Sequence, residues 1–206
     1  MPDIEPKLAL EPEHSLLEIG CGPGNLLIPL AARVARAEGV DHPEVGARAR
    51  ERCRDERIRF HDGFFPDVTI EGRFDRVLVY GVIHVLPDWP TLQRFVDAAA
   101  GLLAPGGRLL IGDVPNADRK RRFLGSEAGR NFDAAWKRSM SEAGAAAAED
   151  PFAVFAGAAA VQTLDDESIL GLLERYRGRG FHACVLPQRP ELPFGHTRED
   201  ILIERL

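Results

Sequence analysis

Ser15-Leu16-Leu17-Glu18-Ile19-Gly20-Cys21-Gly22-Pro23-Gly24-Asn25 is the stretch of this chain that decides its fold. A short apolar run contains one acidic residue near its end, and glycines follow at three alternate positions. Apolar residues then recur at helical spacing between Leu26 and Val34. The pattern predicts a strand, a tight glycine-rich turn and a helix. Glycine lets the backbone approach a ligand closely and a helix start offers unpaired N–H groups, so the turn predicts a nucleotide site.

The rest of the chain repeats this strand-to-helix rhythm. We predict strands at about 15–19, 37–40, 57–61, 74–80, 108–112, 181–186 and 200–204. We predict helices at about 25–36, 43–54, 88–104 and 166–178. Strands that alternate with helices indicate an α/β protein with a doubly wound, mostly parallel sheet, here of seven strands. No helix separates the last two strands, so we expect strand 7 to be antiparallel.

One long segment interrupts the rhythm. Residues 114–163 are rich in Ala and Arg, carry no strand signal and are too many for a simple connection. We predict a helical insertion between strands 5 and 6 that lies as a lid over the carboxyl edge of the sheet, where such sheets bind ligands. The length of 206 residues fits a single domain over 1–206.

Composition limits the partners and the compartment. The net charge of −6 argues against a general nucleic-acid binder, and the basic cluster Arg119–Arg122 either meets an anionic substrate or forms a solvated face. Three cysteines without a CxxC pair favour neither a metal site nor a disulfide framework, as in a reduced cytoplasmic compartment. The N-terminus does not resemble a signal peptide, and no segment has the ~20 apolar residues of a membrane span.

Three motifs in order resemble those of class I methyltransferases that depend on S-adenosyl-L-methionine (SAM). Glu18-x-Gly20-x-Gly22-x-Gly24 resembles the first motif, and Gly39-Val40-Asp41 stands where the family has the acidic end of its second strand. Leu102-Leu103-x-Pro105-Gly106-Gly107-Arg108-Leu109-Leu110-Ile111 is similar to the entry of the fifth strand. The resemblance covers about Ser15–Asp113 and implies SAM as the cofactor. The segment 187–200 also looks like that of small methyltransferases from bacterial saccharide and secondary-metabolite pathways.

The resemblance implies how the first two motifs hold SAM. The backbone of the glycine-rich turn would touch the methionine part. Asp41 would accept the ribose hydroxyls, as an acidic residue does at the end of strand 2 in dinucleotide folds; its alternative role is to cap the next helix. Glu18 would order the turn and the cationic end of the cofactor, or else cap a helix or turn.

The adenine pocket has two alternatives in this sequence. The family often has Gly-Asp after its third strand, whereas this chain has Asp62-Gly63-Phe64; Asp62 would bond the exocyclic amine, or it is only a turn residue before the glycine. With a shift of position, Phe64 would instead pack on the ring. The expected cofactor-binding residues are Glu18, Gly20, Cys21, Gly22, Asp41, His42, Asp62, Gly63 and Tyr80.

Catalytic candidates lie after strand 4, after strand 5 and in the connection between strands 6 and 7. His84 is a possible general base, because its ordinary pKa of ~6.5 suits proton transfer at neutral pH, or it packs beside the cofactor. Asp113 would orient substrate or cap the following segment. His196, with Gln188 and Arg198, would recognise substrate or belong to a rigid hairpin.

These observations predict methyl transfer to an oxygen or nitrogen of a small polar metabolite, with a sugar or sugar-like molecule first. The expected protein is a monomer or homodimer with no nucleic-acid or membrane partner. One alternative is a SAM-binding or scaffold subunit without catalysis. A nicotinamide-dependent oxidoreductase is the other, but its turn is usually GxGxxG and the chain shows no Tyr-x-x-x-Lys pair.

Overall fold

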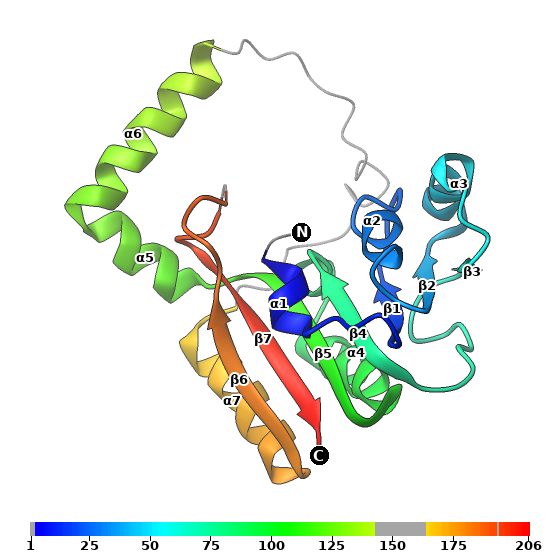
Figure 1. Ribbon diagram of the computed structural model, residues 1–206. Coiled ribbons are helices and arrows are strands. Elements are labelled where there is room, and N and C mark those ends of the chain that lie inside the picture. Colours follow the sequence, from blue (N-terminus) through cyan, green and yellow to red (C-terminus); the bar gives the residue numbers. More distant parts are fainter. Residues whose placement is uncertain (1–2, 143–163, 193) are drawn as a thin grey trace.

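A computed structural model describes residues 3–142, 164–192 and 194–206 (Figure 1). The strands are β1 (Ser15–Ile19), β2 (Arg36–Asp41), β3 (Ile58–Asp62), β4 (Phe74–Tyr80), β5 (Leu103–Pro115), β6 (Phe181–Pro187) and β7 (Arg198–Arg205). They form one sheet in the order β3-β2-β1-β4-β5-β7-β6. β7 is antiparallel to both neighbours, and all other pairs are parallel. The predicted sheet of seven strands, with strand 7 antiparallel, is confirmed.

Helices cover both faces of this sheet. They are α1 (Ile4–Leu8), α2 (Leu27–Ala31), α3 (Pro43–Arg52), the 3-10 turn η1 (Ile83–Val85), α4 (Trp89–Gly101), α5 (Ala117–Gly125), α6 (Glu127–Glu142) and α7 (Asp166–Gly178). Side chains alternate between faces along a strand, so Val77 and Val79 pack with α4 and α7 whereas Leu78 packs with α1 and α2. The central strands are therefore buried on both faces, as their continuous apolar runs predict.

Local sequence explains where the two longer helices on one face begin. Asp88 caps α4 by accepting a hydrogen bond from the Thr91 amide at 2.7 Å. Asp165 caps α7 in the same way, accepting from the Ser168 amide at 2.8 Å. Each cap satisfies an N–H group that lacks a partner within its helix.

Some predicted boundaries are wrong. The helix predicted at 25–36 is the short α2, because β2 pairs with β1 from Arg36 onward and needs the preceding residues for the chain reversal. β5 is longer than 108–112 because Leu103 already pairs with Phe74, ahead of the Pro-Gly-Gly segment. The short helix α1 is absent from the helices predicted from the sequence.

The predicted insertion is helical where it is described. α5 leaves the carboxyl end of β5, and α6 continues from it beyond the same end of the sheet (Figure 1). Asn116 holds the start of α5 in place. Its side-chain Nδ2 donates to Asp166 and Glu199 at 2.8 Å each, and its Oδ1 accepts from the backbone amide of Arg119. Residues 143–163 of the predicted insertion lie outside the described residues, and the lid stays a prediction.

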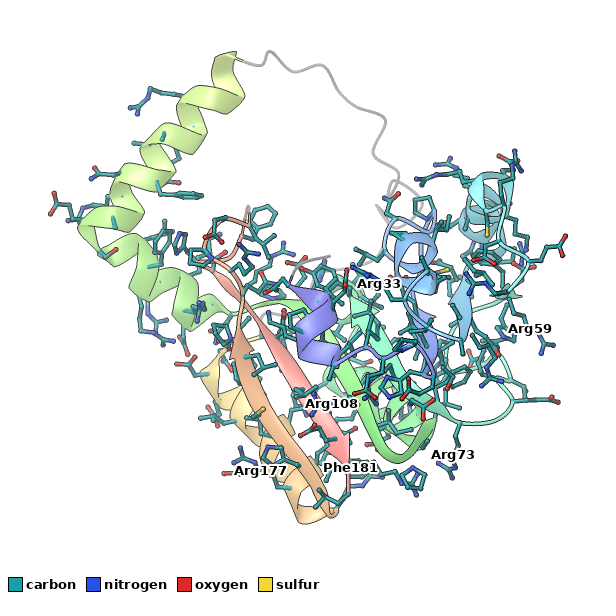
Figure 2. All side chains as sticks on the ribbon, viewed as in Figure 1. Arg33, Arg59, Arg73, Arg108, Arg177 and Phe181 are labelled. Atoms are coloured by element: carbon teal, nitrogen blue, oxygen red, sulfur yellow. The ribbon has the colours of Figure 1, made fainter. Side chains whose placement is uncertain are left out.

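Surface charge is spread over the molecule. Figure 2 labels the exposed Arg33, Arg59, Arg73 and Arg177, which come from separate parts of the chain. Among the residues with a described structure, no helix has both the length and the apolar character needed to cross a bilayer.

Candidate cofactor and acceptor site

A cavity of about 710 Å³ lies at the carboxyl ends of β1, β2, β4 and β5. This is the edge where ligands of doubly wound sheets bind. The cavity brings together residues far apart in the sequence, from Glu18 to Arg198. The predicted site residues that line it are Glu18, Gly20, Cys21, Gly22, Asp41, His42, Gly63, Tyr80, His84 and Asp113. Asp62 and His196 are the two predicted residues that are absent from this lining.

The glycine-rich turn forms one wall of the cavity. Gly20 has φ +78°, and a Cβ there would lie 2.4 Å from Val82 Cγ2, so no larger residue fits. Gly22 has φ +55°, and a Cβ there would meet no atom within 4 Å. The amides of Gly20 and Cys21 donate to the Val40 carbonyl at 2.8 and 3.2 Å, which fixes the turn to β2. The backbone is thus held open toward the cavity.

Asp41 joins the end of β2 to the same turn. Its Oδ2 accepts from the Gly22 amide and its Oδ1 from the His42 amide, both at 2.7 Å. These bonds fix the carboxylate at the cavity wall. An ionised carboxylate has about four acceptor positions, so two backbone amides leave capacity for a pair of ligand hydroxyls.

Glu18 is buried beneath the turn and lacks a full set of partners. Its side chain is 2% exposed, and Oε2 has no hydrogen-bond partner among the described residues. Burial raises the pKa of Glu18 well above its ordinary value, the Asp41 charge raises it further, and a hydrogen bond from the Leu27 amide opposes the rise. A cationic group in the cavity would satisfy this carboxylate. The residues present therefore fit a ligand that carries an ammonium group and a ribose.

The two candidates for the adenine contact, Phe64 and Asp62, lie in different places in the described structure. Phe64 lines the cavity, is 60% exposed and lies against His42 with ring centroids 4.9 Å apart. Asp62 instead pairs with Arg50 at 2.7 Å on the exposed side of α3. The structure thus brings Phe64, rather than Asp62, to the cavity. The sequence already offered Phe64 as the alternative, with the adenine-binding position shifted along the chain.

The opposite wall carries polar groups from β4, η1, β5 and β7. His84 lines the cavity, and its buried Nδ1 has no partner within the described parts of the chain. Burial lowers the pKa of His84, the Arg198 charge lowers it further, and the Asp113 charge opposes both. Asp113 and Arg198 form an ion pair with about a fifth of each side chain exposed. Neutral His84 can therefore accept a proton beside a pair of opposite charges.

His196 does not reach this cavity. Its ring stacks on Phe123 with centroids 4.5 Å apart and an interplanar angle of 8°, and it meets the edge of Phe132. It packs the β6–β7 connection against α5 and α6, which is why the expectation of a catalytic His196 is not supported. The basic cluster is also largely neutralised, because Arg119, Arg121 and Arg122 pair with Glu199, Asp118 and Asp166.

The apolar part of the lining was missed. Phe65, Pro87 and Phe95 line the cavity beside Leu86, and none of these three was predicted as a site residue. Only the topology of the sheet brings these residues to the carboxyl edge, so periodicity could not find them. The described residues hold no cluster of three metal-ligating side chains.

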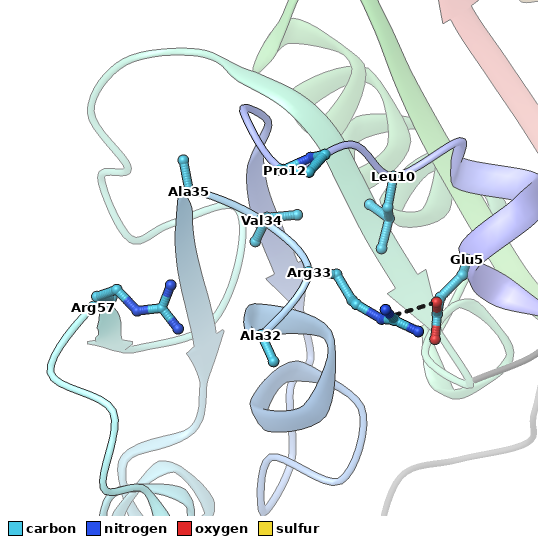
Figure 3. A pocket seen from close by; sticks show the side chains of 8 residues that line it. All are labelled: Glu5, Leu10, Pro12, Ala32, Arg33, Val34, Ala35 and Arg57. Atoms are coloured by element: carbon cyan, nitrogen blue, oxygen red, sulfur yellow. Dashed lines mark ion pairs between the residues drawn. The ribbon is translucent and has the colours of Figure 1, made fainter.

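A second pocket of about 480 Å³ lies at the amino ends of β1, β2 and β3 (Figure 3). Its lining includes Leu10, Pro12 and Ala35, and Arg33 pairs with Glu5 across it at 3.3 Å. The buried side-chain atoms without partners in the described structure lie elsewhere. This pocket carries no sign of a site.

The fold is Rossmann-like, with a cavity at the edge where such sheets bind nucleotides, and part of the chain is similar to known methyltransferases. A family model of the methyltransferase domain matches residues 16–107. Trans-aconitate 2-methyltransferase of Methylobacterium radiotolerans is 35% identical over 108 residues, which are 51% of this chain and 40% of that protein. Chondramide synthase of Chondromyces crocatus is 30% identical over 120 residues, which are 55% of this chain and 3% of that protein.

A solved structure extends the likeness beyond the matched sequence. N-methyltransferase NodS from Bradyrhizobium japonicum WM9, in complex with S-adenosyl-L-homocysteine (SAH), has a TM-score of 0.62, 17% identity, and coverage of 98% of this chain and 82% of that chain. The match of residues 16–107, the curated relatives and the shared fold support a class I SAM-dependent methyltransferase. SAM is the cofactor of this family. The matched stretch spans less than half of the two curated relatives described above.

Proposed function

We propose that this protein transfers the methyl group of SAM to an oxygen or nitrogen of a small polar molecule. The observation that carries the proposal is one cavity in which a glycine-rich turn, Asp41 and the partly unsatisfied Glu18 face His84 and the Asp113–Arg198 pair. One half has the groups to hold an adenosyl cation, and the other has the groups to position an acceptor.

The chain's own residues bind and orient the cofactor in this proposal. Asp41 accepts the ribose hydroxyls, Glu18 balances the positive charge of the methionine part, and His42 with Phe64 flanks the base. SAM supplies a methyl group on a sulfonium, which is already a strong electrophile. Apolar side chains such as Leu86 and Phe95 keep water out of the cavity.

On the acceptor side, alignment is the main contribution of the protein. Holding two reactants in line can be worth about 7–11 kcal/mol. His84 takes the proton from an attacking hydroxyl at a ring nitrogen, and its lowered pKa keeps the imidazole neutral and ready at neutral pH. An amine acceptor that arrives neutral needs this base less. The Asp113–Arg198 pair would orient polar groups of the acceptor.

The acceptor we propose is a small metabolite, with a sugar or sugar-like molecule first. Hydroxyl-rich ligands match the mixture of a carboxylate, a guanidinium and an imidazole on this wall. One relative above is named for a small acid and another for transfer to nitrogen, which supports a small acceptor of either atom type. We further propose that the protein acts in the cytoplasm as a monomer or homodimer, with no nucleic-acid partner, and that residues 114–163 act as a lid.

Cofactor identity is tested by titration calorimetry with SAH, SAM and NAD. SAH and SAM should bind in the micromolar range or tighter, with NAD giving no heat of binding. Binding of NAD in place of SAH would revive the oxidoreductase alternative.

Turnover is tested with SAM labelled at its methyl carbon and a metabolite extract of the source organism. A labelled product with a mass increase of one methyl group supports the enzyme and names the acceptor. If SAH binds but no extract fraction takes up label, the alternative of a non-catalytic SAM-binding subunit replaces the proposal.

A further inference from the structure

β5 contains a bulge where it reaches the cavity. Ile111 pairs with Ile201 and Val114 pairs with Glu199, so Gly112 and Asp113 together oppose the single residue Asp200. Asp113 has φ +61°, in the left-handed region that non-glycine residues rarely adopt. Bulges occur beside active sites because they turn a side chain away from the regular alternation of the strand. Here the side chain that is turned is Asp113, which lines the cavity.

Asp200 lies directly behind this bulge. Its side chain is fully buried, and its Oδ1 accepts from the Asp113 amide and from Gln188 Nε2, both at 2.9 Å. Its Oδ2 accepts from Lys7 Nζ at 2.7 Å, and Lys7 also binds Asp3 at 2.6 Å. The two oxygens therefore have different partners: one holds the bulge and the other holds the N-terminal helix α1.

The backbone bond matters because the bulge amide has left the regular ladder. An unsatisfied buried N–H costs about 1–3 kcal/mol, so Asp200 stabilises the bulged form of β5 over a regular one. Gly112 belongs to the same arrangement, since a Cβ there would lie 2.4 Å from Tyr80 Cδ2. The bond to Asp200 therefore favours the left-handed conformation of Asp113.

We propose that Asp200 is a positioning residue that, through the Asp113 amide, sets the Asp113–Arg198 pair at the acceptor side of the cavity. Asp200 contacts neither cofactor nor acceptor and acts through Asp113. The inference deepens the proposed function and rests on it, because it assigns the two halves of the cavity to cofactor and acceptor.

The fixed pair also narrows the class of acceptor. Asp113 Oδ2 accepts from Arg198 Nη1, while Oδ1 of Asp113 has no hydrogen-bond partner among the described residues and Arg198 has further N–H groups. A carboxylate and a guanidinium side by side present an acceptor next to donors, with no net charge. Such a surface suits a neutral group that both donates and accepts, such as a pair of neighbouring hydroxyls or an amide. A free carboxylate would meet the like charge of Asp113 beside Arg198, and a free ammonium would meet the like charge of Arg198 beside Asp113.

Two substitutions at one position separate positioning from anchoring of α1. Asp200→Ala removes both roles, whereas Asp200→Asn keeps an oxygen for the Asp113 amide and loses the charge that binds Lys7. The probes are SAH for the cofactor half, and methyl-labelled SAM with the metabolite extract for the acceptor half. Asp97→Asn serves as the matched control, because Asp97, like Asp200, accepts hydrogen bonds from three groups, here side chains of α7 and of the residue that follows it, away from the cavity lining.

We expect Asp200→Ala to bind SAH within about threefold of the unchanged protein and to form labelled product at least tenfold more slowly. Asp200→Asn and Asp97→Asn should stay within threefold in both measurements. Hydrogen exchange at the Asp113 amide should be faster in Asp200→Ala alone. If Asp200→Ala does not fold, Asp200→Ser, whose hydroxyl is too short to reach that amide, takes its place.

The outcomes distinguish the two proposals. Equal losses in Asp200→Ala and Asp200→Asn would mean that Asp200 acts as an anchor for α1, and would overturn the inference. Unchanged product formation and unchanged amide exchange in Asp200→Ala would overturn it as well. Failure of the proposed function has another signature: the unchanged protein itself does not bind SAH or does not label the extract. If the unchanged protein binds SAH but does not label the extract, hydrogen exchange at the Asp113 amide still decides whether Asp200 holds the bulge.

Discussion

The two halves of the cavity are built in different ways. The cofactor half comes from adjacent sequence, the turn after β1 and the end of β2, and it presents mainly backbone with Glu18 and Asp41. The acceptor half draws His84 from η1, Asp113 from β5 and Arg198 from β7. The backbone geometry of the cofactor half depends on a few glycines, so a short sequence motif predicts it. A side-chain constellation depends on the topology and is assembled by folding.

The difference has consequences for mutation. Changes on the cofactor side should alter SAH affinity, whereas changes on the acceptor side should alter turnover and leave SAH affinity in place.

Gly20→Ala should have the largest effect, lowering SAH affinity about 100-fold or more. A residue with φ +78° is strained by ~1–3 kcal/mol, and its Cβ would also displace Val82. Titration calorimetry measures the loss. Gly171→Ala is the control, since Gly171 lies in α7 with open space at its Cβ position. Wild-type affinity in Gly20→Ala would show that the turn does not touch the cofactor.

His84→Gln should lower turnover about 100-fold, as expected for loss of a general base, with SAH affinity nearly unchanged. Burial, and then Arg198, lower the pKa of His84, so the imidazole stays uncharged at neutral pH. In the unchanged protein the rate should therefore fall only below the ordinary histidine pKa of ~6.5. A rate profile of labelled product against pH checks both points. A loss of SAH affinity without a loss of turnover would move His84 to the cofactor half.

The sequence predicted the two halves to different depths for this physical reason. The doubly wound sheet and the places of Gly20 and Asp41 at the cavity follow from motifs in which each residue is tied to its neighbours in the chain. His196 has the residue type of a catalytic group, but a ring stack on Phe123 holds it away from the cavity. The sequence predicts that Arg198 recognises substrate or belongs to a rigid hairpin, but nothing local indicates its pairing with Asp113, 85 residues away.

Asp41→Ala should weaken SAH binding by about 1–3 kcal/mol, because ribose hydroxyls lose a charged acceptor and the Gly22 amide loses its partner. Turnover at saturating SAM should change much less. Calorimetry and saturation kinetics separate the two quantities. Asp55→Ala is the control, since that carboxylate binds Arg57 in an exposed loop. Unchanged affinity in Asp41→Ala would contradict the ribose assignment.

Phe64→Ala and Asp62→Ala form a pair that decides the adenine contact. Stacking of a base on an aromatic ring is worth about 1–3 kcal/mol, so Phe64→Ala should weaken SAH binding by that amount. Asp62→Ala should change it less than twofold, because Asp62 faces Arg50 outside the cavity lining. The reverse ranking in calorimetry would restore Asp62 as the group that binds the exocyclic amine.

The smallest expected effect is the release of a fraction of a proton from Glu18 when SAH binds. Burial raises the pKa of Glu18, so near that pKa part of the protein carries a proton there before ligand arrives. A bound ammonium group favours the ionised carboxylate, so SAH binding should release protons as it lowers that pKa. Calorimetry in buffers with different ionisation heats measures the number released, which should fall to near zero in Glu18→Gln. Release that is equal in both proteins would place the titrating group elsewhere, and Glu18 would then have to be satisfied within the turn instead of by the ligand.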